Sequence, residues 1–519
     1  MAQQEFRVDL SKINFPLLST EQGRTVVSRD SEELYHKQNN IPNMYFCQNV
    51  MPYKEGYKSV GFTSIIDAAL SSQEKLLQEG GDFLLLEDSD NLLLVPGVTI
   101  SDVRTIYSPD GVRAHLIWDE AGGVYSLVSG GTTWNSVSGA PAVAGTFTVE
   151  DITIGTVNST SYIYYKNQGC YTIDIDTNTM SAQTLTGLVA ADILGVLGSN
   201  GYLVAYTEIA DFHSSLLDPT DFTPSQITGA GGGGVADIDG PIKFGVSHAL
   251  GFMLYTEANV VAATYTGNKQ YPFKHREVIG SRGGISLDLL AYEANSDSQF
   301  VFTTGGMQTI SASKSSMILP EVTDFLSGKV MEDFDTTTLE FTKTEVAGSL
   351  LKKVKLIASR YLVISYGISE FTHALIYDVA LDMLGKVKIT HVDTFEYLGG
   401  QEDVAKQSLC FLLPTGEVKH LDFTTGSGVM IIGKMQYTRS RLTTLHNIEV
   451  ENAESITVYD LPALHGKLLS DAVAGTPVLT EDDLKSFAFK NTAKNHNVAI
   501  LGEFKANTVV AIYVNHGIR

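Results

Sequence analysis

The chain has 519 residues, of which 43% are hydrophobic and 18% are charged. This length allows about two to four domains of ordinary size. The apolar content can fill a large core, and the composition excludes disordered, collagen-like and coiled-coil proteins. No apolar run reaches about 18 residues, so the sequence predicts no membrane-spanning helix. The first residues lack a basic segment followed by an apolar run, so no secretory signal is expected.

The net charge is strongly negative and unevenly distributed. The chain carries 36 Lys and Arg against 59 Asp and Glu, a formal charge of −23. Residues 101–240 hold only 3 basic against 15 acidic residues, whereas residues 433–519 hold 9 of each. Proteins that grip nucleic acid through its phosphates need clustered Lys and Arg. The charge pattern therefore argues against sequence-reading DNA binders and against proteins that bind anionic membranes.

The N-terminal residues 1–62 show no long helical periodicity and are predicted to form an irregular arm with short strands. One short helix is expected over Ile65–Gln78. From about residue 80 the pattern changes to paired short apolar runs, rich in β-branched and aromatic residues and separated by turn residues. Such pairs are typical of β-hairpins. The predicted pairs are 83–86 with 92–95, 115–118 with 124–128, 162–165 with 170–175, 202–206 with 212–217, 251–255 with 260–265, 299–303 with 307–310, 361–366 with 373–377, and 409–413 with 417–423.

The hairpins recur with a period close to that of a β-propeller blade. Taking one residue from each of the last seven units gives steps of 40 to 62 residues: Trp118, Tyr164, Val204, Met253, Val301, Val363 and Phe411. A blade cannot bury both of its faces alone, but radial packing of several blades does so. Residues 63–432 are therefore predicted to form an all-β propeller of seven, possibly eight blades, with the 83–95 hairpin as the uncertain unit. A pair of stacked β-sandwiches is the alternative.

After Gly433 the rhythm and the charge balance both change, and residues 433–519 are predicted to form a separate small β domain resembling a sandwich. The expected strands are 434–442, 444–450, 455–461, 487–490, 497–501 and 508–514. In the last two, the apolar residues Val498, Ile500, Val509, Ala511 and Tyr513 alternate with their neighbours.

Motifs that could carry chemistry are better explained as structure. Asp174, Asp176 and Asn178 have the first spacings of a calcium loop, but Thr179 and Leu185 occupy its required Gly and Glu positions. A hairpin turn is the better interpretation. The glycine run 229–234 lacks the Lys-Ser/Thr and the strand-to-helix context of a phosphate-binding loop, and a flexible loop between blades is expected.

Catalytic and metal-binding patterns are also missing. The twelve His residues show no zinc spacing, and Cys47, Cys170 and Cys410 are expected to be buried reduced thiols. Ser108–Gly111 is interpreted as a plain turn rather than a sialidase-type Asp box. The acid pairs Asp119/Glu120 and Asp482/Asp483 are adjacent, so on strands they point to opposite faces and cannot be assigned as a glycosidase pair. No catalytic residue, cofactor site or metal site is predicted.

Several short segments resemble one known family. They are 212–224 with its Asp218-Pro219 step, 240–242, the hairpin 251–257, 265–267, 271–273, 280–285, the N-terminal 43–46 and 56–62, 374–386, and Arg439 with 447–451. Their order is similar to that of the packaged-DNA stabilisation proteins of short-tailed bacteriophages, also called tail hub or nozzle proteins.

The resemblance implies a structural virion protein of the tail, assembled in the host cytoplasm and not an enzyme. It implies a homo-oligomeric ring, commonly a hexamer, that extends the portal–adaptor channel, retains packaged double-stranded DNA and conducts it at ejection without reading its sequence. Implied partners are portal and adaptor proteins and other tail proteins such as fibres, spikes or a needle. The acidity fits, since positive walls would trap DNA, and we expect acids such as Asp174, Asp176, Asp218 and Asp221 to face the channel.

Two other functions compete with this interpretation. One is a propeller that binds or cleaves glycans, which would need carboxylates and aromatic rings gathered at one mouth of the propeller. The other is an interaction scaffold of another propeller class. Candidate contact surfaces are the glycine-rich loop 229–240, the insertion 325–350 and the C-terminal domain.

Overall fold

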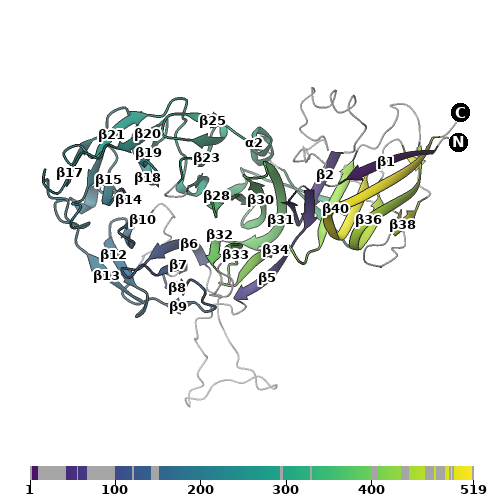
Figure 1. Cartoon of the computed structure of the whole chain (residues 1–519), viewed down its shortest axis with the longest axis horizontal. Coiled ribbons are helices and arrows are strands. Elements are labelled where there is room, and N and C mark those ends of the chain that lie inside the picture. The colour runs from purple at the N-terminus through teal and green to yellow at the C-terminus, as the bar shows by residue number, and fades with distance from the viewer. Residues whose placement is uncertain are drawn as a thin grey trace, which may run out of the picture.

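A computed structural model of the whole chain gives the architecture (Figure 1). The structure describes residues 3–9, 43–54, 56–66, 100–119, 122–141, 151–292, 296–327, 330–398, 407–433, 443–461, 473–474, 485–489, 492–493 and 496–516.

Seven antiparallel sheets, here called blades 1 to 7, follow one another along the described chain. Each begins with an inner strand near the centre of the ring and ends with a strand at its rim (Figure 1). Blades 1 to 3 contain β6 (Ile100–Tyr107), β7 (Arg113–Asp119), β8 (Val124–Val128) and β9 (Asn135–Ser136); β10 (Ile152–Val157), β11 (Thr160–Tyr165), β12 (Gly169–Asp174) and β13 (Thr179–Gln183); and β14 (Gly195–Ser199), β15 (Tyr202–Tyr206), β16 (Ala210–His213) and β17 (Gly231–Gly234).

The remaining blades use the same antiparallel order. Blades 4 and 5 contain β18 (Ile242–His248), β19 (Gly251–Thr256), β20 (Val260–Tyr265) and β21 (Phe273–Glu277); and β22 (Leu290–Ala291), β23 (Gln299–Thr303), β24 (Gly306–Ile310) and β25 (Ser315–Met317). Blades 6 and 7 contain β28 (Leu351–Ile357), β29 (Tyr361–Gly367), β30 (Phe371–Asp378) and β31 (Met383–His391); and β32 (Asp393–Leu398), β33 (Gln407–Leu412) and β34 (Val418–Asp422).

Apolar cores between consecutive blades identify the ring as a propeller. Alternate side chains of a strand point to opposite faces of its sheet, so one strand serves two cores. In β11, Ile163 and Tyr165 pack against blade 1, whereas Tyr164 packs against blade 3. Each pair of neighbouring blades shares such a cluster, and the cluster between blades 7 and 1 closes the ring. The predicted all-β propeller fold is confirmed.

The seven predicted hairpins after residue 100 are the two middle strands of the seven blades. Their seven register residues, from Trp118 to Phe411, all lie on the second strand and are at most 1% exposed. The eighth predicted hairpin, 83–95, lies outside the described residues. The helix predicted over Ile65–Gln78 is wrong at its start, because Ile65 and Ile66 belong to a strand; the rest of it is not described.

N-terminal strands complete the last two blades. β5 (Gly61–Ile66) pairs with β34 and forms the outer strand of blade 7. The hairpin of β3 (Val50–Tyr53) and β4 (Gly56–Ser59) adds two strands to the outer edge of blade 6. The chain therefore completes its last two blades by pairing its beginning with residues more than 330 positions later.

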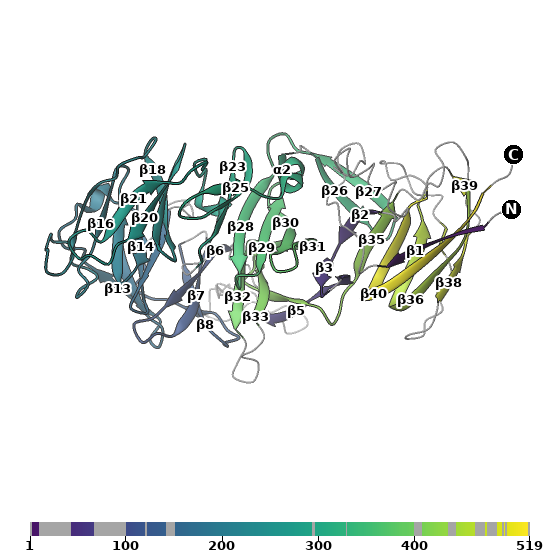
Figure 2. The same cartoon turned by 45° about the horizontal axis from the view of Figure 1, so that its top comes forward.

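The C-terminal part is one eight-stranded sheet that folds over on itself (Figure 2). Two long strands, β36 (Thr443–Asp460) and β40 (Val498–His516), pair along their lengths and are interrupted by bulges between Glu451 and Ile456. Side chains from both ends of these strands, such as Ile448 and Val458, share one core. The other strands are β1 (Gln3–Asp9), β2 (Asn43–Gln48), β35 (Gly428–Gly433), β37 (Val473–Ala474), β38 (Lys485–Ala488) and β39 (Thr492–Ala493).

In the second half of β40, the residues that face the core are not the predicted ones. Val498 and Ile500 face the core as expected, but Val510, Ile512 and Val514 are buried there rather than Val509, Ala511 and Tyr513. Both sets of residues are apolar, so alternation alone does not select the inner face.

The predicted division into 1–62, 63–432 and 433–519 cuts across paired strands. β1 and β2 of the expected arm belong to the C-terminal sheet, as does β35, which begins before residue 433. These segments supply the edge strands that each sheet needs, and sequence pattern does not show which distant strand an edge will pair with.

The insertion between blades 5 and 6 contains α2 (Pro320–Ser327) and a hairpin of β26 (Val330–Asp335) and β27 (Glu340–Glu345). The hairpin lies between the propeller and the C-terminal sheet (Figure 2). Phe334 and Phe341 pack against Phe46 of β2, with ring centroids 6.1 and 5.3 Å away. This face of the predicted contact surface 325–350 is therefore occupied by the chain's own C-terminal sheet.

The glycine run predicted to be a flexible loop is instead a strand. Gly231–Gly234 is β17, which pairs with β16 from Ala210↔Gly234 to His213↔Gly231. Main-chain pairing needs no side chain, and a Cβ on Gly232 would lie 2.3 Å from the carbonyl oxygen of Asp211. The predicted flexible loop is wrong, because glycine content alone does not show that a neighbouring strand will pair with the segment.

Candidate functional site

Buried charges join the inner strands of three blades across the ring closure. The ammonium of Lys353 on β28 lies 2.8 Å from a carboxylate oxygen of Asp102 on β6 and 2.8 Å from one of Asp393 on β32. The three side chains are at most 4% exposed. Blades 6, 7 and 1 are thus connected by one ion cluster, which we call the axial cluster.

Further cations balance the two carboxylates of the axial cluster. Arg104 pairs with Asp102, and the ammonium of Lys355 lies 3.1 Å from Asp393. Burial opposes ionisation of Asp102, but Arg104 and the lysines outweigh it and hold the pKa of this carboxyl well below its usual range. Burial also opposes the charge of Lys353, but Asp102 and Asp393 raise the pKa of this ammonium. Removing one partner would leave uncompensated buried charge.

A cavity of about 370 Å³ lies beside the axial cluster, lined by the inner strands of blades 5, 6, 7 and 1. We call it the axial cavity. Its lining includes the charged Arg104, Arg113, Asp288, Lys355 and Glu396, the polar Thr394, and the aromatic Tyr107, Tyr292 and Phe395. The three core members Asp102, Lys353 and Asp393 are not among its lining residues.

Some polar atoms at the axial cavity are buried without a hydrogen-bond partner among the described residues. They are Nε of Arg113, Oγ1 of Thr394, Oε1 of Glu396 and Oδ1 of Asp288, the last of which lies 3.5 Å from the ammonium of Lys353. The side chains of Arg113 and Glu396 also contact each other through their other atoms: an NH2 nitrogen of Arg113 donates to Oε2 of Glu396 at 3.0 Å. Buried polar atoms in proteins are usually satisfied by protein, water or ligand.

Beside this cavity, His115 on β7 is fully buried against the ring of Phe395, 4.7 Å between centroids. Burial, helped by Arg113, lowers the pKa of His115 to about 3. The unfolded imidazole takes up a proton near pH 6.5 and the folded one does not, so stability present above pH 6.5 is lost as the pH falls towards 3.

The wild type should therefore lose about 2 kcal/mol of unfolding free energy through His115 between pH 7 and pH 5, and we expect His115→Phe to abolish this part of the loss. Urea denaturation at both pH values measures it; an equal loss in variant and wild type would contradict it.

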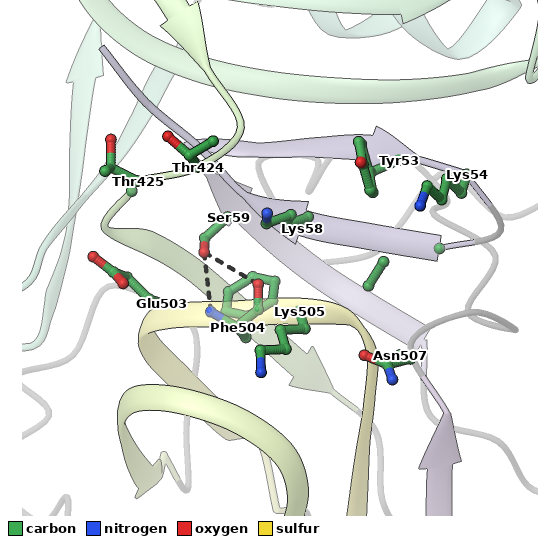
Figure 3. Close-up of a pocket in the computed structure, with 13 residues that line it drawn as sticks. Tyr53, Lys54, Lys58, Ser59, Thr424, Thr425, Glu503, Phe504, Lys505 and Asn507 are labelled. Carbon is green, nitrogen blue, oxygen red and sulfur yellow. Dashed lines mark hydrogen bonds between the residues drawn. The ribbon is translucent and has the colours of Figure 1, made fainter. Parts of the chain in front are cut away.

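A larger pocket, of about 740 Å³, lies between the propeller and the C-terminal sheet (Figure 3). The β3–β4 hairpin contributes Tyr53, Lys54 and Lys58, and the bend of β40 contributes Glu503 and Lys505. With three lysines and one glutamate, its lining is net positive. At its base, the hydroxyl of Ser59 donates to the carbonyl of Phe504 at 3.3 Å and accepts from its amide at 3.0 Å, which fixes β4 against β40.

The four acids predicted to face a channel lie on corresponding connections of blades 2 and 3. Asp174 and Asp176 are exposed in the β12–β13 turn, and Asp218 and Asp221 lie between β16 and β17. Three of them also stabilise turns: Asp174, Asp218 and Asp221 each accept hydrogen bonds from amides two residues on. The Thr177 amide lowers the pKa of Asp174, and the Thr223 amide lowers that of Asp221. In addition to their charge, these carboxylates therefore have a structural role.

The motifs interpreted as turns are turns in the structure. Asp174–Asn178 connects β12 with β13, and the amide of Gly111 donates to the carbonyl of Ser108 at 2.8 Å. Cys47, Cys170 and Cys410 are free and buried, and burial raises the pKa of the first two thiols to about 12. Asp119 is buried at the end of β7, where it accepts a hydrogen bond from the Gly123 amide; Glu120, Asp482 and Asp483 lie outside the described residues.

The described ranges contain neither a group of metal ligands nor a membrane-spanning helix. No group of three or more His, Cys, Asp or Glu side chains there is placed to hold a metal ion. No helix in those ranges is both long and apolar enough to cross a lipid bilayer.

Comparisons with known proteins found matches among solved structures. No protein-family model and no curated protein matches the sequence. Similar solved structures include the WD40 β-propeller domain of Doa1 (8% identity, 63% of this chain, 93% of that chain, TM-score 0.35). Another is U3-55K (7% identity, 63% of this chain, 95% of that chain, TM-score 0.38). A third is the Myceliophteria thermophila Cps50 (Swd1) β-propeller domain (10% identity, 63% of this chain, 97% of that chain, TM-score 0.37). The fold assignment rests on the closed ring of inter-blade cores and not on these likenesses.

Sequence reasoning missed the axial cluster. Asp102 and Lys353 are 251 residues apart, and other charged residues share their strands, Arg104 on β6 and Lys352 and Lys355 on β28. The only sequence signal is a charged residue where a buried inner strand would be expected to carry an apolar one.

Proposed function

We propose that this chain is a structural virion protein, a tail hub or nozzle subunit of a short-tailed bacteriophage. Copies of it would form a ring, commonly a hexamer, that continues the portal–adaptor channel, contacts other tail proteins, retains packaged DNA and conducts it at ejection. The observation that carries the proposal, with the sequence resemblance, is the group of four acids on blades 2 and 3, of which Asp174, Asp176 and Asp218 are exposed and Asp221 is half-buried. These blades lie on the side of the propeller away from the C-terminal sheet (Figure 1).

The charges at the centre of the propeller support a scaffold role. Each cation of the axial cluster has a carboxylate partner, and each carboxylate has a cation. Such pairing favours a fixed assembly of blades, because separating them would leave uncompensated buried charge. Exposed carboxylates, in contrast, would repel DNA phosphates within a Debye length of about 10 Å at ordinary ionic strength, which keeps a channel wall from trapping DNA.

Ejection kinetics of the phage that encodes the chain test the proposal. Because three of the four acids stabilise turns, the variant Asp174→Asn/Asp176→Asn/Asp218→Asn/Asp221→Asn is preferable to charge reversal: the amide oxygen can still accept the turn hydrogen bonds. We expect assembled particles with at least several-fold slower ejection and a stronger dependence on salt. The matched control is Asp335→Asn in the β26–β27 turn, where Asp335 accepts from the Thr337 amide. Unchanged ejection in the fourfold variant would count against the proposal.

A further inference from the structure

We propose that the axial cavity is a binding site for a neutral saccharide unit. This inference concerns a different part of the molecule from the exposed acids and does not depend on the virion role. Its volume of about 370 Å³ lies within the range of about 300–1,000 Å³ typical of small-molecule sites.

The charge balance of the walls excludes ions as the favoured ligands. Among the cations that line the cavity, Arg113 pairs with Glu396, Arg104 with Asp102, and Lys355 with Asp393. The remaining lining carboxylate, Asp288, lies 3.5 Å from the ammonium of Lys353. An anion would have to displace one of these carboxylates, and a cation would have to displace a guanidinium or an ammonium. A ligand without net charge avoids that cost.

The unmet hydrogen-bonding capacity has the pattern that a hydroxyl-rich ligand satisfies. Within the described part of the chain, Nε of Arg113 can donate, Oε1 of Glu396 can accept, and the hydroxyl of Thr394 can do both. Thr394 is 1% exposed and lines the cavity, so its hydroxyl is a built feature of the wall and not a surface group. Sugar hydroxyls also donate and accept, and can therefore satisfy all three.

Aromatic rings supply an apolar surface at the same cavity. Tyr107 and Tyr292 are half-buried lining residues from two inner segments, whereas Phe395, 4% exposed, packs against His115 in the core between blades 7 and 1. The face of a pyranose ring that carries mainly C–H groups can pack on such rings, while its hydroxyls meet the polar atoms. The combination of balanced charge, unpartnered polar atoms and aromatic rings distinguishes this cavity from the positively charged pocket of Figure 3.

Saturation-transfer NMR on the full chain tests the assignment. The probes are glucose, galactose, mannose, N-acetylglucosamine and rhamnose, with inorganic phosphate as the charged comparison. We expect saturation transfer to at least one neutral sugar and none to phosphate. Thr394→Val removes the hydroxyl at nearly constant volume, and should weaken the binding of that sugar by about five- to tenfold.

Two further variants separate recognition from folding. Glu396→Gln should weaken sugar binding to a similar degree while keeping the side-chain shape, and Thr264→Val, an exposed site on blade 4, should leave it unchanged. Circular dichroism and thermal unfolding confirm that each variant is folded. Transfer to none of the five sugars, transfer to phosphate alone, or unchanged binding in both cavity variants would overturn the proposal.

Discussion

Replacing Lys353 with methionine should lower the free energy of unfolding by about 3–5 kcal/mol, the usual cost of breaking a buried ion pair by removing one partner. The ammonium lies 2.8 Å from both Asp102 and Asp393, and methionine fills similar space without the charge. Two carboxylates on neighbouring blades would then face each other with only Arg104 and Lys355 to compensate. Since the cluster spans the ring closure, we expect the propeller to open at blade 7. Urea denaturation followed by tryptophan fluorescence measures the loss, because Trp134 lies in the core shared by blades 7 and 1 and Trp118 in the core shared by blades 1 and 2.

The neighbouring residue provides the control. Lys352 is half-buried on the opposite face of β28, where its ammonium lies 5.1 Å from the ring of Phe302. Lys352→Met should cost less than about 1 kcal/mol, since an exposed or partly exposed cation–π contact contributes little. Equal losses of unfolding free energy in the two variants would show that removing any lysine of β28 has this effect. That result would contradict the role assigned to the axial cluster.

Truncating Phe334 to alanine should cost about 3–5 kcal/mol, as expected for a large aromatic side chain in a packed core. This ring is 2% exposed and lies 4.9 Å from Phe341 and 6.1 Å from Phe46. The three phenylalanines join the insertion hairpin to the C-terminal sheet. The loss should therefore be local, and the β26–β27 hairpin should become sensitive to proteolysis before the propeller unfolds.

Limited proteolysis followed by mass spectrometry locates the first cleavage sites. Phe371→Ala is the matched control, because this ring is half-buried on blade 6 and lies 5.9 Å from His391. It should leave the hairpin as resistant as in the wild type. First cleavage of the Phe334 variant within the blades would contradict the assignment of the hairpin as the connection between the two parts.

The repeat of the propeller could be predicted from the sequence because the middle strands of each blade are buried on both faces. Continuous apolar runs such as Tyr202–Tyr206, broken by turn residues, mark these strands without reference to the rest of the chain. Inner and outer strands carry a weaker pattern. β17 has four glycines and no side chain to bury, so only its pairing with β16 identifies it as a strand.

Long-range pairing could not be predicted. Nothing in the composition of Gly61–Ile66 shows that it will complete a blade with Val418–Asp422, because the pairing is decided by which edge is left open when the ring closes. The same holds for β1 and β2, which were predicted to form an irregular arm. The axial cluster is the extreme case: its members come from three strands, and each strand carries further charged residues from which sequence pattern does not single out the buried one.

Electron microscopy of the purified protein, alone and mixed with portal–adaptor complexes of a short-tailed phage, tests the proposed function most directly. We expect closed rings that attach coaxially below the adaptor, with blades 2 and 3 of each copy turned towards the central channel. Single propellers that leave the portal–adaptor complexes bare would contradict the proposal. So would rings whose channel is lined by Lys54, Lys58 and Lys505, the lysines of the pocket between the propeller and the C-terminal sheet.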